Sequence, residues 1–179
     1  MVEAAEAMID EPDSGPLTLA ALAARLGVKQ PSLYKHIDGM DDLRRSITVR
    51  AKHELATVMA RSAVGKVGAD AVTAMSHGWR NWAAAHPGRY AATVAAPADG
   101  DAEDQAASFE IINVALEVVS SFGLDGDDVV DAIRALRTVL HGFVMLEVGG
   151  AFHLPADMDR SFDRLLAVLV AGFEDWSTP

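Results

Sequence analysis

The 179-residue chain is predicted to be an all-α protein, with a small N-terminal three-helix module followed by a helical bundle. Two observations carry this prediction. Apolar residues recur at helical spacing along nearly the whole chain, and no segment alternates apolar and polar residues as a half-buried strand does. Half of the residues are apolar, which is enough to form a substantial core. We expect the module to occupy residues 1–45 and the bundle to occupy residues 46–179.

Local signals mark the ends of the expected helices. Thr18 can cap the start of a helix, and Gly27 can end it. Pro31 falls in the first turn of a short helix, where its missing N–H is harmless. Asp41 and Asp42 place acids at the positive end of the next helix. The expected helices span residues 2–9, 19–26, 30–36, 41–61, 69–86, 89–96, 102–122, 127–147 and 157–176.

Charge is distributed unevenly along the chain. The formal net charge is −11 and the sequence pI is about 4.8, which argues against nucleic-acid binding by the chain as a whole. Residues 17–61, however, contain eight Lys and Arg against four Asp and Glu, whereas residues 62–179 contain seven against 17. This asymmetry predicts a basic module on an acidic body.

Several classes of protein are disfavoured by what the sequence lacks. The chain has no cysteine, so it has no disulfide and no thiolate metal site. The start is acidic and the apolar runs are short, so we expect neither a signal peptide nor a membrane span, and we expect a cytoplasmic protein. The histidines lack metal-ligand spacing and no nucleophile motif is present, so we expect no catalytic residue, metal or cofactor.

A helix, a glycine-containing turn and a short helix near the start form a helix-turn-helix arrangement. Leu33 and Ile37 share one face and are expected to pack on Leu22 and Leu26. The polar side chains that remain outside suit DNA, because an amide such as that of Gln30 can form two hydrogen bonds to adenine and the hydroxyls and amines suit phosphates. The alternative is an ordinary solvated helix surface. The expected DNA-contacting residues are Thr18, Lys29, Gln30, Pro31, Ser32, Tyr34, Lys35 and His36.

The segment LTLAALAARLGVKQPSLYKHIDGMDDL, residues 17–43, resembles the DNA-binding domain of the TetR family of bacterial transcriptional repressors. The family's Leu-Thr start and its Leu-Ala, Leu-Gly-Val and Leu-Tyr-x-His patterns are all present, and the Gln-Pro-Ser-Leu-Tyr run is similar to the tetracycline repressor's own branch. The resemblance implies a homodimer that binds palindromic double-stranded operator DNA under the control of a small-molecule effector. The alternative is a helical ligand-binding or scaffold protein without DNA binding, which the charge of −11 favours.

The segment also departs from the family pattern. Ile37 replaces an aromatic residue, and Lys29 and Gly39 stand where many members have capping serines. Met40 replaces a lysine that commonly contacts phosphate, and we expect either Arg44 or its neighbour at position 45 to compensate, the alternative being two solvated charges. The first helix is short and lacks the family's basic N-terminal arm, which is consistent with a truncated or misassigned start.

The family resemblance implies that the remaining body binds a small molecule and dimerises. Residues 140–152, LHGFVMLEVGGAF, resemble a TetR subfamily with a Trp-His-Gly signature, although Leu140 replaces the tryptophan. Large apolar side chains with a few polar ones are what a ligand pocket needs, and we expect one among residues 69–86, 102–122 and 127–147. The alternative is that these residues are ordinary core. The expected ligand-binding residues are Met75, Trp79, Trp82, Phe109, Asn113, His141 and Met145.

Wide apolar stripes on the last two expected helices predict the dimer interface. Two copies packed as a four-helix bundle would bury the surplus apolar surface. A two-fold axis would also let two short recognition helices read one palindrome. The expected interface residues are Ile133, Leu136, Leu140, Phe162, Leu165, Leu169 and Phe173.

Overall fold

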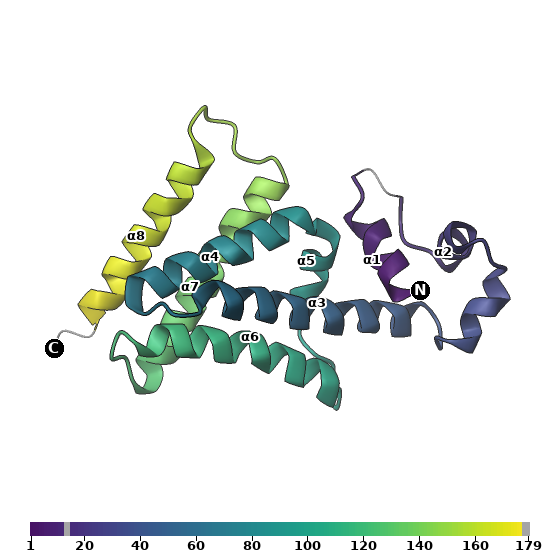
Figure 1. Cartoon of the computed structure of the whole chain (residues 1–179), viewed down its shortest axis with the longest axis horizontal. Coiled ribbons are helices and arrows are strands. Elements are labelled where there is room, and N and C mark those ends of the chain that lie inside the picture. The colour runs from purple at the N-terminus through teal and green to yellow at the C-terminus, as the bar shows by residue number, and fades with distance from the viewer. Residues whose placement is uncertain (13–14, 177–179) are drawn as a thin grey trace. The chain divides into compact units, whose positions relative to one another are not determined.

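The computed structural model describes residues 1–12 and 15–176, and every regular element in these ranges is helical, which confirms the all-α prediction (Figure 1). Residues 13–14, in the predicted break after the first helix, lie outside the described residues. Helix bounds agree with expectation to within two residues, except that the helix expected to end at residue 96 ends at Thr93. The elements are α1 (Val2–Asp10), α2 (Leu19–Leu26), the 3-10 helix η1 (Gln30–Lys35), α3 (Met40–Ala63), α4 (Gly68–Ala85), α5 (Pro87–Thr93), α6 (Ala102–Ser120), α7 (Gly126–Val148) and α8 (Met158–Trp176).

Contacts group the chain into two compact units. The first contains residues 1–54 and 85–108, and the second contains residues 55–84 and 109–179, so helices α3 and α6 each contribute to both. The first unit includes the acidic helix α1 and the acidic start of α6, and its sequence carries eight Lys and Arg against 13 Asp and Glu. The unit that contains the helix-turn-helix is therefore acidic as a whole, although residues 17–61 carry a net positive charge. The domain boundary at residue 45 stays a prediction.

The core of the first unit is built by short amphipathic helices. Leu22, Leu33 and Ile37 are buried together in one hydrophobic cluster with residues of α1 and the start of α3, as expected. The expected partner Leu26 is 37% exposed. Seven residues carry Leu26 about 10 Å along the helix axis from Leu19, so its side chain lies beyond the end of the cluster.

Helices α1 and α5 pack closely within the first unit. Gly88 makes this possible, because a Cβ at that position would lie 2.1 Å from the backbone oxygen of Ile9. No side chain larger than hydrogen fits between the two backbones at this point. The start of α5 is therefore held directly against the end of α1.

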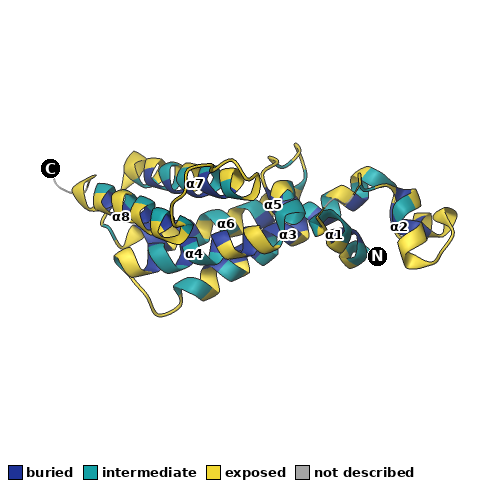
Figure 2. Ribbon diagram, turned by 90° about the horizontal axis from the view of Figure 1, so that it is seen from above, coloured by how far each residue is buried: buried dark blue, intermediate teal, exposed yellow. Residues whose placement is uncertain are grey.

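The second unit is a bundle formed by α4, α7, α8 and parts of α3 and α6. Figure 2 shows that the long helices carry one buried and one exposed face. No helix in the described ranges is long and apolar enough to cross a membrane. The largest fully buried side chains of this unit come from α3, α4, α7 and α8 and are Leu55, Met59, Met75, Leu136, Leu140, Phe162, Leu166 and Phe173.

Candidate DNA-binding surface and effector domain

The turn of the helix-turn-helix is fixed by its capping residues. The Thr18 side chain accepts a hydrogen bond of 3.1 Å from the backbone N–H of Ala21 and so caps α2. Gly27 ends the helix in the left-handed region at φ 68°, which glycine adopts without steric cost. The chain then enters η1 with Pro31 in its first turn. Thr18 therefore has a structural role, in addition to the predicted phosphate contact.

The second helix of the motif is a 3-10 helix, not an α-helix. Such a helix has three residues per turn, so side chains three apart lie in one row. Leu33 is only 3% exposed and is buried in the core, whereas Gln30, which precedes it in the same row, is exposed at the start of the helix. The other two rows, Pro31 with Tyr34 and Ser32 with Lys35, are exposed on the outer side.

All eight predicted DNA-contacting residues are exposed. Within residues 1–12 and 15–176, no side-chain hydrogen bond or ion pair engages Lys29, Gln30, Ser32, Tyr34, Lys35 or His36. Their donors and acceptors are therefore available to a partner, and Leu33 and Ile37 hold the segment that carries them. Their contacts with DNA stay a prediction.

Most other basic side chains near the motif are neutralised by acids of the first unit. Arg25 pairs with Glu11 at 2.6 Å, and Lys52 pairs with Asp104 at 2.5 Å in a buried position. Arg50 donates to Glu6 at 2.9 Å. The positive charge available to DNA is consequently confined to a few residues around η1 and the start of α3.

Arg45 is also bound to acidic side chains. It is therefore not free to replace the phosphate contact that family members make with a lysine at the position of Met40. Its guanidinium binds Asp101 through two hydrogen bonds and Glu103 through a third. Hydrogen bonds from Arg45 lower the pKa of Asp101 to about 2. Arg44 remains the candidate, because its side chain is 64% exposed and lies 3.6 Å from an exposed Asp41.

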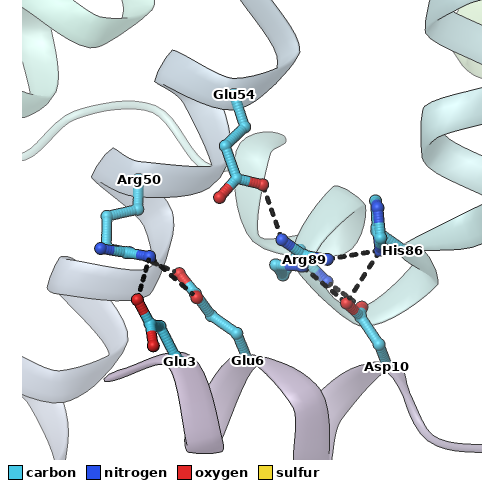
Figure 3. Close-up of polar contacts among 7 residues, drawn as sticks. All are labelled: Glu3, Glu6, Asp10, Arg50, Glu54, His86 and Arg89. Atoms are coloured by element: carbon cyan, nitrogen blue, oxygen red, sulfur yellow. Dashed lines mark hydrogen bonds and ion pairs between the residues drawn. The ribbon is translucent and has the colours of Figure 1, made fainter. Parts of the chain in front are cut away.

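A polar cluster joins α1, α3 and α5 (Figure 3). Arg89 donates from its backbone N–H and its Nε to the two oxygens of Asp10, at 2.9 and 2.6 Å. It also donates to Glu54 on α3 at 2.6 Å. His86 contacts both Arg89 and Asp10. Sequence reasoning missed this cluster, although Glu3, Glu6 and Asp10 occupy one helical face, a spacing that calls for basic partners.

The predicted ligand-binding residues differ in how far they are buried. Met75, Trp79 and Trp82 are buried on α4. Phe109, on α6, is 60% exposed, and the others on α6 and α7 also reach the surface. These surface positions are Asn113 and Met145, which are exposed, and His141, which is half-buried. Burial first, and then the charge of Arg137, lowers the pKa of His141. The ligand-binding role of these seven residues stays a prediction.

The second unit does contain a hollow elsewhere, between the end of α7, the loop after it and the start of α8. Its volume is about 430 Å³, which falls in the range of small-molecule pockets. The lining residues are Phe143, Ala151, Phe152, His153, Leu154, Ala156, Met158 and Ser161.

Arg80 joins three helices beside this hollow. It donates to Glu147 of α7 at 2.8 and 2.5 Å and to Asp159 of α8 at 2.8 Å. Its guanidinium also lies over the rings of Phe143 and Phe162, 5.3 and 4.9 Å from their centroids. The side chain is only 8% exposed. A buried arginine with both carboxylate and aromatic partners fixes the relative positions of α4, α7 and α8.

Four residues predicted at the dimer interface lie inside the single chain. Leu136, Leu140, Phe162 and Phe173 are each 2% exposed or less. Helices α7 and α8 turn these side chains toward the chain's own core, so they have no surface to offer a second copy. The most apolar stripe of an amphipathic helix usually faces the core of its own chain. The stripe that is strongest in the sequence is therefore the one that the chain itself buries.

The other predicted interface residues keep part of their surface. Ile133, Leu165 and Leu169 are half-buried. Val168 lies on the same side of α8 as Leu165 and Leu169 and is 72% exposed. An apolar face of α8 therefore remains uncovered by the chain itself. No group of three or more His, Cys, Asp or Glu in the described ranges could hold a metal ion.

Comparison with known proteins identifies similar transcriptional regulators over nearly the whole chain. Residues 72–169 match the family described as tetracyclin repressor-like, C-terminal domain. The uncharacterized HTH-type transcriptional regulator Rv0681 of Mycobacterium tuberculosis is 38% identical over 99% of this chain and 82% of that protein. The uncharacterized HTH-type transcriptional regulator YobS of Bacillus subtilis is 29% identical over 96% of this chain and 90% of that protein.

A solved structure shows the same fold. The crystal structure of TetR from Acinetobacter baumannii AYE matches with a TM-score of 0.71 and 20% identity, covering 99% of this chain and 96% of that one. The chain therefore belongs to the TetR family and is a TetR-type transcriptional regulator. This is a family of regulators and not of enzymes. The Trp-His-Gly subfamily stays a prediction.

Proposed function

We propose that the protein is a cytoplasmic repressor that binds palindromic operator DNA as a homodimer and is controlled by a small-molecule effector. The observation that carries the DNA-binding part is the exposed outer side of η1, whose polar side chains have no partner within the described residues. The buried Leu33 and Ile37 hold this side in place. A helix anchored in this way can enter a major groove with its polar side chains toward the bases.

Control by an effector needs two states of the dimer. Recognition helices about 34 Å apart match successive major grooves, and another separation does not. An effector shifts this equilibrium only by binding one state better than the other. The effector-free dimer then represses by binding the operator. An effector that favours the separation that does not match the grooves releases it.

The dimer is proposed to form through the uncovered face of α8. Val168 is the most exposed apolar residue of this face. Replacing it by aspartate places a charge in an apolar contact, which weakens association strongly. The control is Val64→Asp, because Val64 lies in the same unit and is also 72% exposed but follows α3.

Sedimentation and operator binding, measured on the same samples, test this proposal. Wild type and Val64→Asp should sediment as dimers and bind a labelled operator. Val168→Asp should sediment as a monomer and bind the operator at least about tenfold more weakly. Equal behaviour of the two variants would exclude this face as the interface. A wild-type protein that binds no duplex at low salt would favour the alternative, a helical scaffold.

A further inference from the structure

We propose that the hollow at the α7–α8 turn is the binding site for a neutral aromatic small molecule, and that this molecule is the effector. The effector role rests on the proposed function, whereas the binding role does not. The site differs from the interior position expected from the sequence, because none of its lining residues lies on α4 or α6.

The lining determines the class of ligand. It contains four large apolar side chains and no Asp, Glu, Lys or Arg. The rings of Phe143 and Phe152 lie 5.1 Å apart between centroids and are tilted by 43°. Two rings at such an angle offer a ligand ring both face and edge contacts. The nearby charges of Arg80, Glu147 and Asp159 are already paired with one another, so an ionic ligand would find no counter-ion there.

Two polar side chains can orient the ligand. The hydroxyl of Ser161 donates to the backbone oxygen of Asp157 at 2.9 Å, so its oxygen can still accept a hydrogen bond. The ring of His153 can either donate or accept. A neutral aromatic molecule with a hydroxyl or amine group therefore satisfies both the apolar walls and the polar positions.

The position of the hollow gives a physical reason why a bound ligand would affect the packing of α4, α7 and α8. Phe143 lines it and also packs on Phe162, with 4.9 Å between ring centroids, and lies under the guanidinium of Arg80. Met158, another lining residue, precedes the Arg80 partner Asp159. A ligand that contacts Phe143 and Met158 thus acts directly on the junction of α4, α7 and α8.

Two fluorescent probes that differ by one charged group test the ligand class. N-phenylnaphthylamine is neutral, aromatic and carries an N–H, and anilinonaphthalene sulfonate adds a negative charge. The neutral probe should bind the full chain at least about fivefold more tightly than the sulfonate. Absence of binding by the neutral probe, or tighter binding of the sulfonate, would overturn the proposal.

Three variants locate the probe. Phe152→Ala removes a wall and Ala156→Trp fills the space, and each should weaken the neutral probe at least about tenfold. The matched control Phe109→Ala removes an exposed phenylalanine at the position expected from the sequence and should change its affinity less than about twofold. Circular dichroism confirms that each variant is folded. Loss of binding in Phe109→Ala, with affinity retained in the other two, would place the ligand elsewhere and overturn the proposal.

Two further measurements separate the possible failures. If Ala156→Trp weakens dimerisation by as much as it weakens the probe, the hollow is filled by a second copy and the proposal is wrong. Operator binding is then measured with and without the neutral probe, and a probe-dependent change seen in wild type should vanish in Ala156→Trp. A wild-type operator affinity that the bound probe leaves unchanged would overturn the effector role. If wild type binds no operator even without the probe, the proposed function fails while the probe-binding result stands.

Discussion

Asp10 receives two hydrogen bonds from Arg89, one from the backbone N–H and one from the guanidinium. Their side chains are 11% and 15% exposed. The pair joins the last turn of α1 to the first turn of α5, at the place where Gly88 lets the two backbones meet. Since Arg89 also binds Glu54, a single arginine connects three helices of the unit that contains the helix-turn-helix.

Removal of the Asp10 carboxylate should destabilise the protein substantially. Asp10→Ala leaves the Arg89 guanidinium and backbone N–H without that acceptor, and we expect a loss of roughly 2–3 kcal/mol in the free energy of unfolding. The matched control is Glu11→Ala, because the Arg25–Glu11 pair is almost half exposed on both sides and should contribute less than about 1 kcal/mol. Urea unfolding at one fixed protein concentration measures both. Equal losses in the two variants would contradict the structural role of Asp10.

Gly88 should not tolerate even one methyl group. Gly88→Ala forces α1 and α5 apart, because the atom it meets is backbone and not a mobile side chain, and overpacking of this kind costs about 1–3 kcal/mol. Gly15→Ala serves as the control, since nothing lies within 4 Å of its Cβ position. Thermal unfolding should show a lowered midpoint for Gly88→Ala only. A wild-type midpoint for that variant would show that the helices are not in close contact.

Gln30 is predicted to read a base. Gln30→Ala should weaken binding to the best operator by roughly 1–3 kcal/mol and relax the preference at one base pair of each half-site. Titration of operators with single base changes measures this. A uniform loss across all duplexes would show that Gln30 does not read sequence.

Lys35 is predicted to contact phosphate. Lys35→Ala should weaken binding to all duplexes alike and lower the slope of log affinity against log salt by about one unit per protomer contact. The control is Arg61→Ala, which removes the same charge from an exposed position of the second unit and should leave the slope unchanged. Anisotropy titrations at several salt concentrations measure the slopes. Equal slopes for wild type and Lys35→Ala would rule out the phosphate contact.

His141 should make stability depend on pH. Burial and Arg137 lower its pKa below 6.5 in the folded chain, so the unfolded chain binds the proton first as pH falls. The unfolding free energy should therefore decrease as pH drops from above 6.5 to the folded pKa, and then level off. His141→Gln should remove this part of the decrease in a series of urea unfolding curves. An unchanged pH profile in the variant would show that His141 is not responsible.

Helical spacing and capping residues were enough to predict the fold. Thr18 and Gly27 set the two ends of α2 through contacts with residues close in sequence. Leu33 and Ile37 are apolar residues in a polar segment, so their burial follows from the sequence. These features depend on neighbours in the chain. Sequence can therefore locate the exposed side of η1 without knowledge of the remaining fold.

Pairings between distant segments could not be predicted in the same way. Arg45 could equally have faced solvent, and only the fold brings Asp101 and Glu103 to it. Likewise, periodicity marks Phe162 and Phe173 as apolar but cannot say whether one chain or two bury them. The hollow after α7 was missed because it is lined largely by a loop, which has no periodic pattern.

Selection of bound duplexes from a random pool by the wild-type protein tests the central claim most directly. A dimer that presents two η1 helices to successive major grooves should enrich a palindrome whose half-sites are centred about 10 base pairs, or a multiple of that, apart. Gln30→Ala should lose the preference at one position of each half-site. Enrichment of no sequence, or of a single unpaired half-site, would contradict the account.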